Sequence, residues 1–419
     1  MGVITLFDKS FLQSLSLNES VWFDHFFMPN VCPLFYVETL ADLGKTIRNG
    51  RSPEQEVGVI ADKFPEMHGT PNAHHFNLCV ENLLGRPVPM TGQIPVAGGD
   101  FVKVEGKTGA VLRETPESAA FSRWLNGEFW DVERNYAKAW RESLSNLNLE
   151  EVAKGFKSLG VSGKSCKSLD DAKAIAESVV HGQTNCFERI KLAIVFLDIP
   201  PQLHRPILER WSLYNYPPLT EYAPYAPYAA HVLTVEVFFQ VALAAGLISA
   251  QRPSNRTDIG YLFYLPFCMA FVSSDKLHMK CAPLFLRKDQ QFIPGPDLKR
   301  GLKEVNEYFS SLPDEIKDKG IMSFANNPPV DGPAYFLGIW DKHFAEWRGR
   351  EETELPEAAL KNEKLLSEFK KYQNAAPLRP EEIDFDPTNI DTMSIQRRVR
   401  RKKGSWCQVP KDLKVEDKN

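Results

Sequence analysis

Short apolar runs alternate with segments of helical periodicity at the start of the chain. The run Val3–Phe7 has the length of a buried strand, and Val31–Val37 has the same character further along. Each run is followed by apolar residues at helical spacing, such as Phe11, Leu12 and Leu15 after the first one. This order of strand, helix, strand and helix predicts an α/β fold with a parallel sheet whose faces are both covered by helices.

The middle of the chain, residues 51–228, loses this rhythm. The Gly, Pro and Val residues of Pro87–Glu114 indicate loops and hairpins, and the charged segment Glu117–Leu169 has helical periodicity. The tyrosine–proline repeat Glu221–His231 predicts a turn-forming connector, because proline continues neither a helix nor a central strand. We interpret this middle segment as a mostly helical insertion or cap.

The strand and helix pattern returns with a long apolar helix, Ala230–Leu247, and a second helical segment that ends at Pro266. The β-rich run Met269–Asp275 and the shorter Pro283–Leu286 are the next strand candidates. The expected units are a first core part at 1–50, the insertion at 51–228, a second core part at 229–296 and a C-terminal extension with a basic tail at 297–419.

Composition and charge narrow the classes of protein. Of the 419 residues, 43% are hydrophobic and 25% are charged, which is typical of a globular protein and excludes a wholly disordered or collagen-like chain. The 50 Lys and Arg residues against 54 Asp and Glu residues give a net charge of −4. This balance excludes a histone-like protein that coats nucleic acid by bulk attraction, but it does not exclude an enzyme whose site clusters its acids.

Cysteine usage and hydropathy indicate a cytoplasmic protein. The 7 cysteines are scattered and include no Cys-x-x-Cys pair, which argues against a disulfide framework and a four-cysteine zinc module. A small cluster that fits the spacing of no standard zinc module consists of His68, His74, His75 and Cys79. The N-terminus lacks the pattern of a secretory signal. The most membrane-like stretch, Ala229–Ala250, contains His231 and Glu236 and therefore predicts a buried helix rather than a membrane span.

Four acidic residues occupy similar places in the predicted pattern. Asp8 and Asp275 end apolar strands, whereas Glu38 follows the second predicted strand and Asp258 begins a predicted helix. Since the carboxyl ends of parallel strands meet at one edge of a sheet, we expect these side chains to converge there. Clustered carboxylates repel one another unless a cation lies between them, and their hard oxygens suit Mg²⁺ or Mn²⁺. The alternative for each acid taken singly is a helix cap.

The motifs around these acids resemble those of the PIN-like nuclease superfamily. The segments that carry the resemblance are VITLFDKSFL, FYVETLADL and TDIGYLFYLPFCMAFVSSDKLH. Asp258 and Asp275 stand 17 positions apart, and Ser273 precedes the last acid by two positions. The resemblance implies a three-layer α/β/α core, here in a large bacterial-type member with a long insertion. It also implies that Asp8, Glu38, Asp258 and Asp275 are the metal ligands and that Ser273 orients them.

The resemblance further implies a metal-dependent endonuclease that acts on RNA rather than DNA by two-metal hydrolysis and leaves a 5′-phosphate. Asp42, one helical turn after Glu38, would either support the site or be a solvated helix acid. Arg256 and Lys276 flank the expected ligands and would contact phosphate, unless they are ordinary surface residues. Two other functions stay open: a PIN-like binding or scaffold protein without catalysis, and a metal-dependent phosphatase with a small substrate.

The C-terminal run Arg397–Lys403 places six basic residues within seven positions. In one interpretation Arg400 and Arg401 grip nucleic acid, with Trp406 available for stacking on a base. In the other, the run is a flexible solubilising end. The expected partner is nucleic acid, and a second copy of the chain or an antitoxin-like protein is the alternative.

Overall fold

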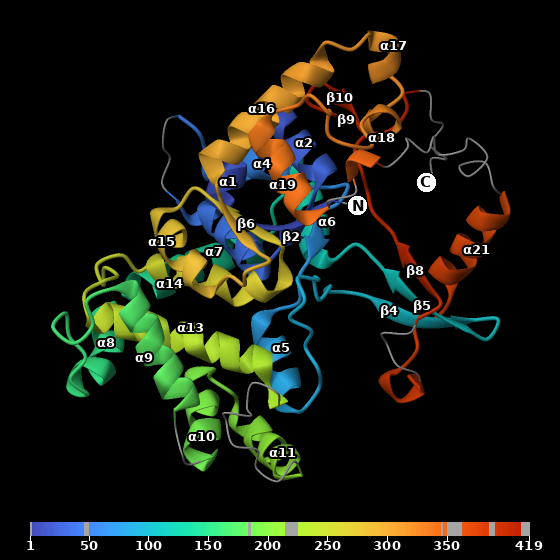
Figure 1. Cartoon of the computed structure of the whole chain (residues 1–419). Coiled ribbons are helices and arrows are strands. Elements are labelled where there is room, and N and C mark those ends of the chain that lie inside the picture. The colour runs from blue at the N-terminus through green and yellow to red at the C-terminus, as the bar shows by residue number, and fades with distance from the viewer. Residues whose placement is uncertain are drawn as a thin grey trace.

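The computed structural model describes residues 2–45, 50–182, 186–213, 225–344, 347–349, 363–384 and 390–411. Its central sheet has the strands β1 (Val3–Phe7), β2 (Phe27–Val31), β3 (Thr70–Pro71), β6 (Ala270–Ser273) and β7 (Gln291–Pro294). The five strands follow the order β3-β2-β1-β6-β7, and every adjacent pair is parallel (Figure 1). The expectation of an α/β fold built on a parallel sheet is therefore confirmed.

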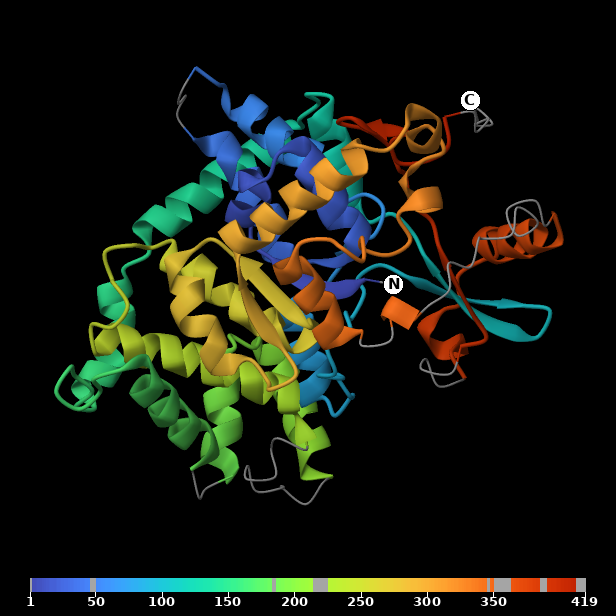
Figure 2. The same cartoon turned by 45° about the horizontal axis from the view of Figure 1, so that its top comes forward.

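Helices cover both faces of this sheet. The first group, whose members contact one another, consists of α1 (Lys9–Ser14), α2 (Leu17–Phe26), α4 (Pro53–Lys63) and α16 (Gly295–Ser310). The second group consists of α13 (Pro227–Ala244), α14 (Asn255–Gly260), η2 (Tyr261–Phe267) and α15 (Lys276–Phe285). Figure 2 shows β6 and β7, in yellow, between the two groups. The central strands β1 and β6 are thus removed from water on both faces, which explains why these two strands are almost continuous apolar runs.

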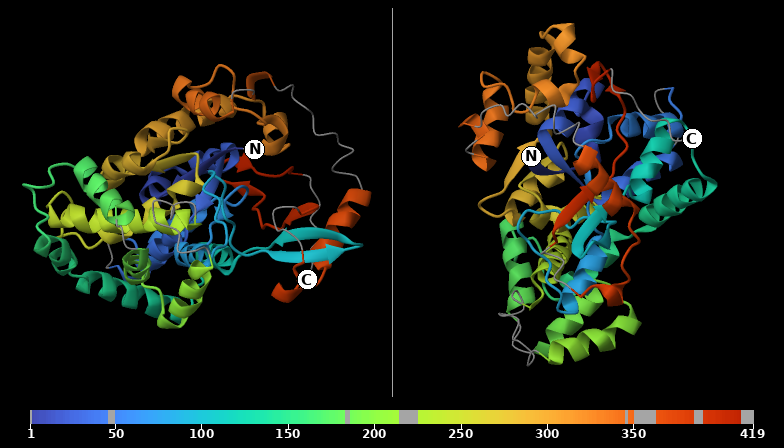
Figure 3. Two further views of the ribbon diagram at one scale, coloured as in Figure 1. Left: turned by 60° about the horizontal axis from the view of Figure 1, so that its bottom comes forward. Right: turned by 90° about the vertical axis from the view of Figure 1, so that its right-hand side faces the viewer.

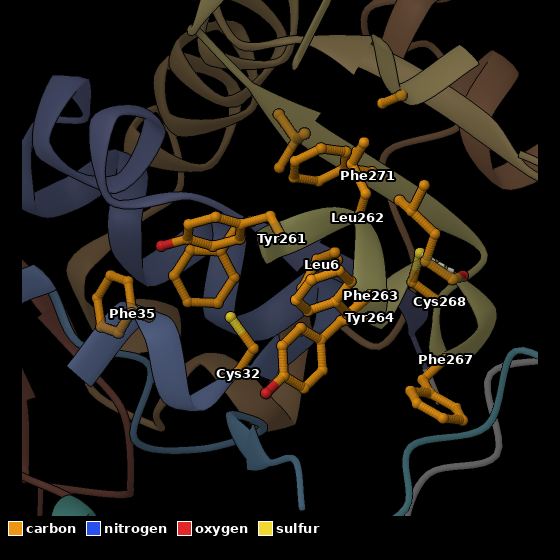
Figure 4. Close-up of a cluster of buried hydrophobic side chains, with 14 of the residues drawn as sticks. Leu6, Cys32, Phe35, Tyr261, Leu262, Phe263, Tyr264, Phe267, Cys268 and Phe271 are labelled. Carbon is orange, nitrogen blue, oxygen red and sulfur yellow. Dashed lines mark hydrogen bonds between the residues drawn. The ribbon is translucent and has the colours of Figure 1, made fainter. Parts of the chain in front are cut away.

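The 3₁₀-helix η2 supplies the aromatic part of the core. Figure 4 shows Tyr261, Phe263 and Tyr264 gathered with Leu6 of β1 and with Phe35, which belongs to the helix after β2. All five side chains are almost completely buried. Burial of each large aromatic side chain stabilises the fold by roughly 2–3 kcal/mol, so this cluster fixes the position of the polypeptide that follows β1 and β2.

The second strand lies earlier than the sequence pattern predicts. It spans Phe27–Val31, and the segment that we expected to be a strand, Val31–Val37, instead enters the helix α3 (Pro33–Leu40). Pro33 occupies the first turn of this helix, where its missing N–H costs nothing. Glu38 consequently projects from a helix and does not stand at the junction of a strand and a helix.

The strand predicted at Pro283–Leu286 is also wrong. These residues belong to or directly follow α15, which runs from Lys276 to Phe285 and contains Pro283. The edge strand of the sheet comes next, at Gln291–Pro294, where the pattern gave no strand. A short apolar run does not by itself distinguish a strand from a helix. Pairing with β6 makes Gln291–Pro294 the edge strand.

The middle segment contributes to the core as well as to outlying structure. Its β3 pairs with β2, so the main sheet includes a strand from residues 51–228. The hairpin predicted within Pro87–Glu114 is confirmed as β4 (Asp100–Val104) and β5 (Lys107–Leu112), with Glu105 and Gly106 at positive φ in its two-residue turn. The short helix η1 (Ala41–Gly44) precedes the middle segment. Besides α4, the helices of the middle segment are α5 (His75–Leu83), α6 (Pro116–Leu125), α7 (Asp131–Asn146), α8 (Leu149–Ser158), α9 (Leu169–His181), α10 (Cys186–Phe196) and α11 (Pro201–Ser212).

The long apolar helix expected near Ala230 is α13. Helices α5, α8, α9 and α10 pack around it, and most of its residues are buried. It is the one helix in the described ranges that is long and apolar enough to cross a membrane, and 83% of its most apolar window is buried inside the protein. The prediction of a buried helix is therefore confirmed. Of the tyrosine–proline repeat, residues 221–224 lie outside the described part, and α13 begins at Pro227.

The C-terminal extension folds back on the body in two places. Strand β8 (Thr392–Ile395) pairs with β5, and the resulting three-stranded sheet extends from the body beside α21 (Glu363–Asn374), as Figure 3 shows. The hairpin β9 (Lys402–Lys403) and β10 (Trp406–Cys407) packs on α2. The other elements are α17 (Asp314–Lys317), α18 (Ile321–Phe324), α19 (Ala334–His343), η3 (Trp347–Gly349) and η4 (Pro380–Glu382).

Burial of the hairpin corrects the two expectations for the basic run. The Trp406 ring is buried against Trp22, with 4.7 Å between ring centroids, so it offers no face for stacking on a base. Both indole N–H groups donate to Asn306 Oδ1, at 3.1 and 2.9 Å. Lys403 is also buried, and its Nζ donates to the carbonyl oxygen of Phe64 at 2.8 Å. The end of the run is therefore folded structure rather than a flexible solubilising segment.

Two buried histidines predict how stability depends on pH. Burial lowers the pKa of His25 and of His231 to about 4 in each case, although the hydrogen bond that each ring donates to a backbone carbonyl raises it. In the unfolded chain these rings titrate near ~6.5, so below that pH the unfolded state binds more protons and stability is lost as the pH falls toward 4.

We expect the free energy of unfolding to fall by about 1 kcal/mol per histidine between pH 7 and pH 5.5. Urea unfolding at a series of pH values measures this. His231→Gln, which keeps a donor but does not titrate, should flatten the pH dependence. An unchanged slope in this variant would contradict the assignment.

Candidate active site

The candidate site lies where the direction of the chain across the sheet reverses. β1 and β6 are neighbours in the middle of the sheet, with β2 and β3 on one side and β7 on the other. Open parallel sheets bind ligands at such a switch point, beyond the carboxyl ends of the strands. Asp8 directly follows β1, and Asp275 follows β6 by two residues. The topology thus brings the first and last of the predicted acids to adjacent strand ends.

Asp8 is buried, with an exposed fraction of 4%, and it is fully hydrogen-bonded. Its Oδ1 accepts from the Phe11 backbone N–H at 2.8 Å, which makes it the N-cap of α1. Its Oδ2 accepts from the hydroxyls of Ser10 and Ser273, at 2.7 and 2.8 Å. Ser273, which we expected to orient the acids, thus donates to one of them, Asp8. His278 Nδ1 lies 3.5 Å from the same Oδ2.

His278 is the main counter-charge of the site. The ring is buried on α15, Nδ1 lies 2.8 Å from Ser273 Oγ, and Nε2 lies 2.7 Å from the backbone oxygen of Asp258. Burial lowers its pKa, but the hydrogen bond to Asp8, the charge of Asp8 and the contacts of Asp258 outweigh burial and raise it to about 9. The ring is therefore an imidazolium at neutral pH. Reciprocally, burial raises the pKa of Asp8, and His278 with the other donors lowers it below its ordinary value.

Glu38 reaches the site from α3 rather than from a strand end. Its Oε2 accepts a hydrogen bond from the hydroxyl of Tyr261 on η2, and its backbone oxygen accepts from Lys9 Nζ at 3.0 Å. Burial raises the pKa of this carboxyl, against the opposing influence of Lys9 and Tyr261. Tyr261 of the aromatic cluster thus fixes the carboxylate of Glu38. The sequence did not predict that Glu38 lies within a helix.

Asp258 stands in the first turn of α14 and completes the group. Burial raises its pKa, the charge of His278 lowers it, and the charges of Glu38, Asp275 and Asp8 raise it further, to about 7. Within the described part of the chain, neither of its carboxylate oxygens has a hydrogen bond or an ion pair. The net charge of the group therefore depends on pH, because the raised pKa values of Glu38 and Asp258 favour the neutral forms of these carboxyls.

The donor set suits a hard divalent cation, but the ligands are not yet gathered. Four carboxylates offer the oxygen ligands that Mg²⁺ and Mn²⁺ take. However, no three Asp, Glu, His or Cys side chains of the described ranges lie close enough together to hold an ion as they stand. Asp275 uses Oδ1 to cap α15, through the Leu277 N–H at 2.6 Å. Metal binding would therefore require rotation of side chains such as Asp258, which no hydrogen bond restrains.

A cavity of about 550 Å³ opens beside Glu38 and is lined by basic side chains. The basic residues of its lining are Lys9 of α1, Lys45 directly after η1, Arg141 of α7 and Arg252 before α14. Among the described residues, neither arginine has an acidic partner, and both are exposed. Carboxylates next to cationic side chains in one cleft form a site for an anionic substrate.

Asp42 also lies at this cavity, as the sequence predicted for a supporting residue. Its carboxylate is buried and accepts from Lys9 Nζ at 2.9 Å and Lys45 Nζ at 2.7 Å. It therefore positions two of the basic side chains and is not a solvated helix acid.

The flanking basic residues have different surroundings. Arg256 is paired with Glu236 of α13 at 2.5 Å, which neutralises its charge. Lys276, directly after Asp275, is exposed, and it forms no ion pair with an acid of the described ranges.

The two arginines expected in the basic tail lie elsewhere. Arg400 forms ion pairs with Asp62 and Glu66 at the end of α4, each at 2.5 Å. Arg401 belongs to the same segment, and neither residue lines the cavity beside Glu38. A role in binding substrate would require Arg400 to give up two acidic partners.

Sequence reasoning missed most of the residues that surround the acids. Lys9 directly follows Asp8, and Tyr261 follows Asp258 by three residues, so proximity to a predicted ligand is the signal that could have found them. Arg141 carries no such signal, because only the packing of α7 on η1 brings it to the site. The chain matches no family model, and neither a curated protein nor a solved structure is significantly similar to it.

Proposed function

We propose that the protein is a metal-dependent nuclease with a PIN-like, three-layer α/β/α core that hydrolyses phosphodiester bonds of RNA rather than DNA. The observation that carries the proposal is the placement of Asp8 and Asp275 at the ends of β1 and β6, with Asp258 and Glu38 close enough to interact with them. Of these four acids, Glu38 lines the neighbouring basic cavity. The motif resemblance supports the same assignment, and it is the reason why RNA is the expected substrate.

The residues divide into two roles in this proposal. Asp8, Glu38, Asp258 and Asp275 would hold Mg²⁺ or Mn²⁺, which supplies an activated water and stabilises charge on the phosphate. The basic group of Lys9, Lys45, Arg141 and Arg252 binds the phosphates of the substrate and orients them toward the acids. Ser273 and His278 hold the carboxylate of Asp8 in place. These two are positioning residues.

A scaffold protein without catalysis is the second candidate, and one observation favours it. The imidazolium of His278 already offsets the charge of Asp8, and no three ligands stand ready for an ion in the described ranges. A phosphatase with a small substrate would use the same acids. The expectations of a cytoplasmic location, and of a second copy or an antitoxin-like protein as partner, stay predictions.

Cleavage of an end-labelled single-stranded RNA by the wild-type protein tests the proposal. We expect cleavage with Mn²⁺ or Mg²⁺, none with EDTA, and slower cleavage of a DNA of the same sequence. Calorimetric titration with Mn²⁺ provides a readout that does not depend on activity. No cleavage together with no Mn²⁺ binding would leave the scaffold function, and hydrolysis of p-nitrophenyl phosphate without RNA cleavage would favour the phosphatase.

A further inference from the structure

A second cavity, of about 320 Å³, continues from the basic one beneath α7. The two cavities share Trp140, Leu144 and Thr257, so they are adjacent parts of one cleft. Figure 2 shows α7 as a long teal helix at the outside of the domain, where it forms one wall of this cleft. The opposite wall comes from α3, from the start of α5 and from Phe263 of η2.

Flat aromatic rings form both walls of this second cavity. On α7, the rings of Tyr136 and Trp140 are stacked, with 6.4 Å between centroids and 20° between planes. On the opposite wall, His74 and His75 are stacked with 4.5 Å between centroids, and His75 lies 4.8 Å from Phe263. An exposed fraction of 42% leaves Tyr136 accessible to a ligand.

The aromatic cavity is uncharged, in contrast to its neighbour. Burial lowers the pKa of His74, and burial together with the charges of His74 and Arg256 lowers the pKa of His75 to about 3, so both rings are neutral at physiological pH. Arg256 lines the cavity, but Glu236 pairs with it. The cleft therefore changes from a cationic part to a neutral aromatic part at the residues that the two cavities share, Trp140, Leu144 and Thr257.

This sequence of surfaces matches the chemistry of a nucleotide in a single strand. Backbone phosphates are anionic and suit Lys9, Lys45, Arg141 and Arg252, whereas an unstacked base is flat and neutral and stacks on aromatic side chains. A base inside a duplex is already stacked and paired, so only an unpaired base enters such a slot at low cost.

We propose that the cavity between α7 and the His74–His75 wall holds an unpaired nucleobase of a single-stranded nucleic acid whose phosphates lie in the basic cavity. This inference rests on the proposed nuclease function, because it assigns the substrate of the same cleft. It gives α7 the role of a base-binding wall and predicts selection of single strands over duplexes.

Binding measurements in EDTA test the inference without any cleavage. The probes are a fluorescein-labelled single-stranded RNA of about twelve nucleotides and an abasic ribose-phosphate chain of the same length, followed by fluorescence anisotropy. We expect Trp140→Ala to weaken binding of the RNA by about 5- to 100-fold, as expected for the loss of base stacking, and to leave binding of the abasic chain unchanged. Trp140→Phe should restore most of the affinity.

Two further variants serve as controls. Tyr335→Ala removes an aromatic side chain of α19, outside the cleft, and should change neither affinity. Tyr335 is 42% exposed, as Tyr136 of the cleft is. Arg252→Ala should weaken both probes to the same extent, because it removes a phosphate contact.

The outcomes separate this inference from the nuclease proposal. Equal losses for both probes in Trp140→Ala, unchanged RNA binding, or no binding of either probe by the wild type would overturn it, even if the protein cleaves RNA. The expected binding pattern without any metal-dependent cleavage would instead contradict the nuclease proposal and leave the base pocket standing.

Discussion

Asp8→Asn is expected to reduce Mn²⁺-dependent cleavage of RNA by at least ~10³-fold while the fold stays intact. The carboxylate of Asp8 is the acid at the end of the central strand, and it lies in hydrogen-bond contact with Ser273 and next to His278. Removing its charge removes a metal ligand from the proposed site. The same loss is expected for Asp275→Asn, at the end of the neighbouring strand.

The substitution to Asn separates the chemical role of these acids from their structural one. Asp8 caps α1 through the Phe11 N–H, and Asp275 caps α15 through the Leu277 N–H. Asn is as good an N-cap as Asp, so both helix caps persist while the negative charge is lost. At position 8 the substitution also replaces Oδ2, which accepts from Ser10 and Ser273, with an amide donor. Single-turnover cleavage, circular dichroism and Mn²⁺ titration of each variant measure activity, fold and metal affinity separately.

Asp24→Asn is the matched control. Asp24 is a fully buried aspartate on α2 whose oxygens accept from the backbone N–H groups of Glu66, Met67 and His68. This variant should lose stability, because a buried charge-assisted network is weakened, but the rate of cleavage by the folded protein should be unchanged. Unimpaired cleavage in both Asp8→Asn and Asp275→Asn would show that these two acids are only helix caps.

The sequence predicted the parts of the fold that depend on local pattern. The strands at Val3–Phe7 and Ala270–Ser273 are apolar runs bounded by a polar residue, and α13 is apolar around its whole circumference. The second strand was misplaced, because an apolar run such as VCPLFYV is compatible with both a buried strand and a buried helix. Only the proline at the first helical turn distinguishes the two, and Pro33 favours the helix.

The candidate site was predictable only where acids follow strands. Asp8 and Asp275 lie at neighbouring strand ends because parallel strands bring their carboxyl ends together. Arg141 reaches the cavity only because α7 packs on η1, an element far from it in the sequence, and periodicity contains no information on such packing. The basic run before Trp406 has the pattern of a flexible tail, but its last residue, Lys403, is buried. Its ammonium group donates to a backbone carbonyl, which makes this burial possible.

His278→Ala is expected to destabilise the metal-free protein by about 3–5 kcal/mol, since it leaves the buried carboxylate of Asp8 without its counter-charge. In the double variant with Asp8→Asn the further cost of losing His278 should be much smaller, because no uncompensated charge remains. Urea unfolding in EDTA measures the four free energies of this cycle.

His231→Ala provides the comparison for that cycle. His231 is a histidine of α13 that approaches a backbone carbonyl, at 2.9 Å, as His278 does at 2.7 Å, but burial keeps its ring neutral and it contacts no acid in the described ranges. Its removal should cost the same with and without Asp8→Asn. Equal costs for His278→Ala in the two backgrounds would contradict the ion pair.

The same variants decide whether a metal ion and the imidazolium share the carboxylates. If Mn²⁺ binds among Asp8, Asp258 and their neighbours, it replaces the lost positive charge in His278→Ala, so Mn²⁺ should raise the melting temperature of this variant more than that of the wild type. His278→Gln, which keeps side-chain volume and a donor but no charge, should respond in the same way. An equal shift in variant and wild type would place the ion, if it binds, away from Asp8. Because the ring and the metal would be alternative cations for one set of acids, a large Mn²⁺ response in the charge-free variants is the outcome that distinguishes a metal site from a set of paired helix caps.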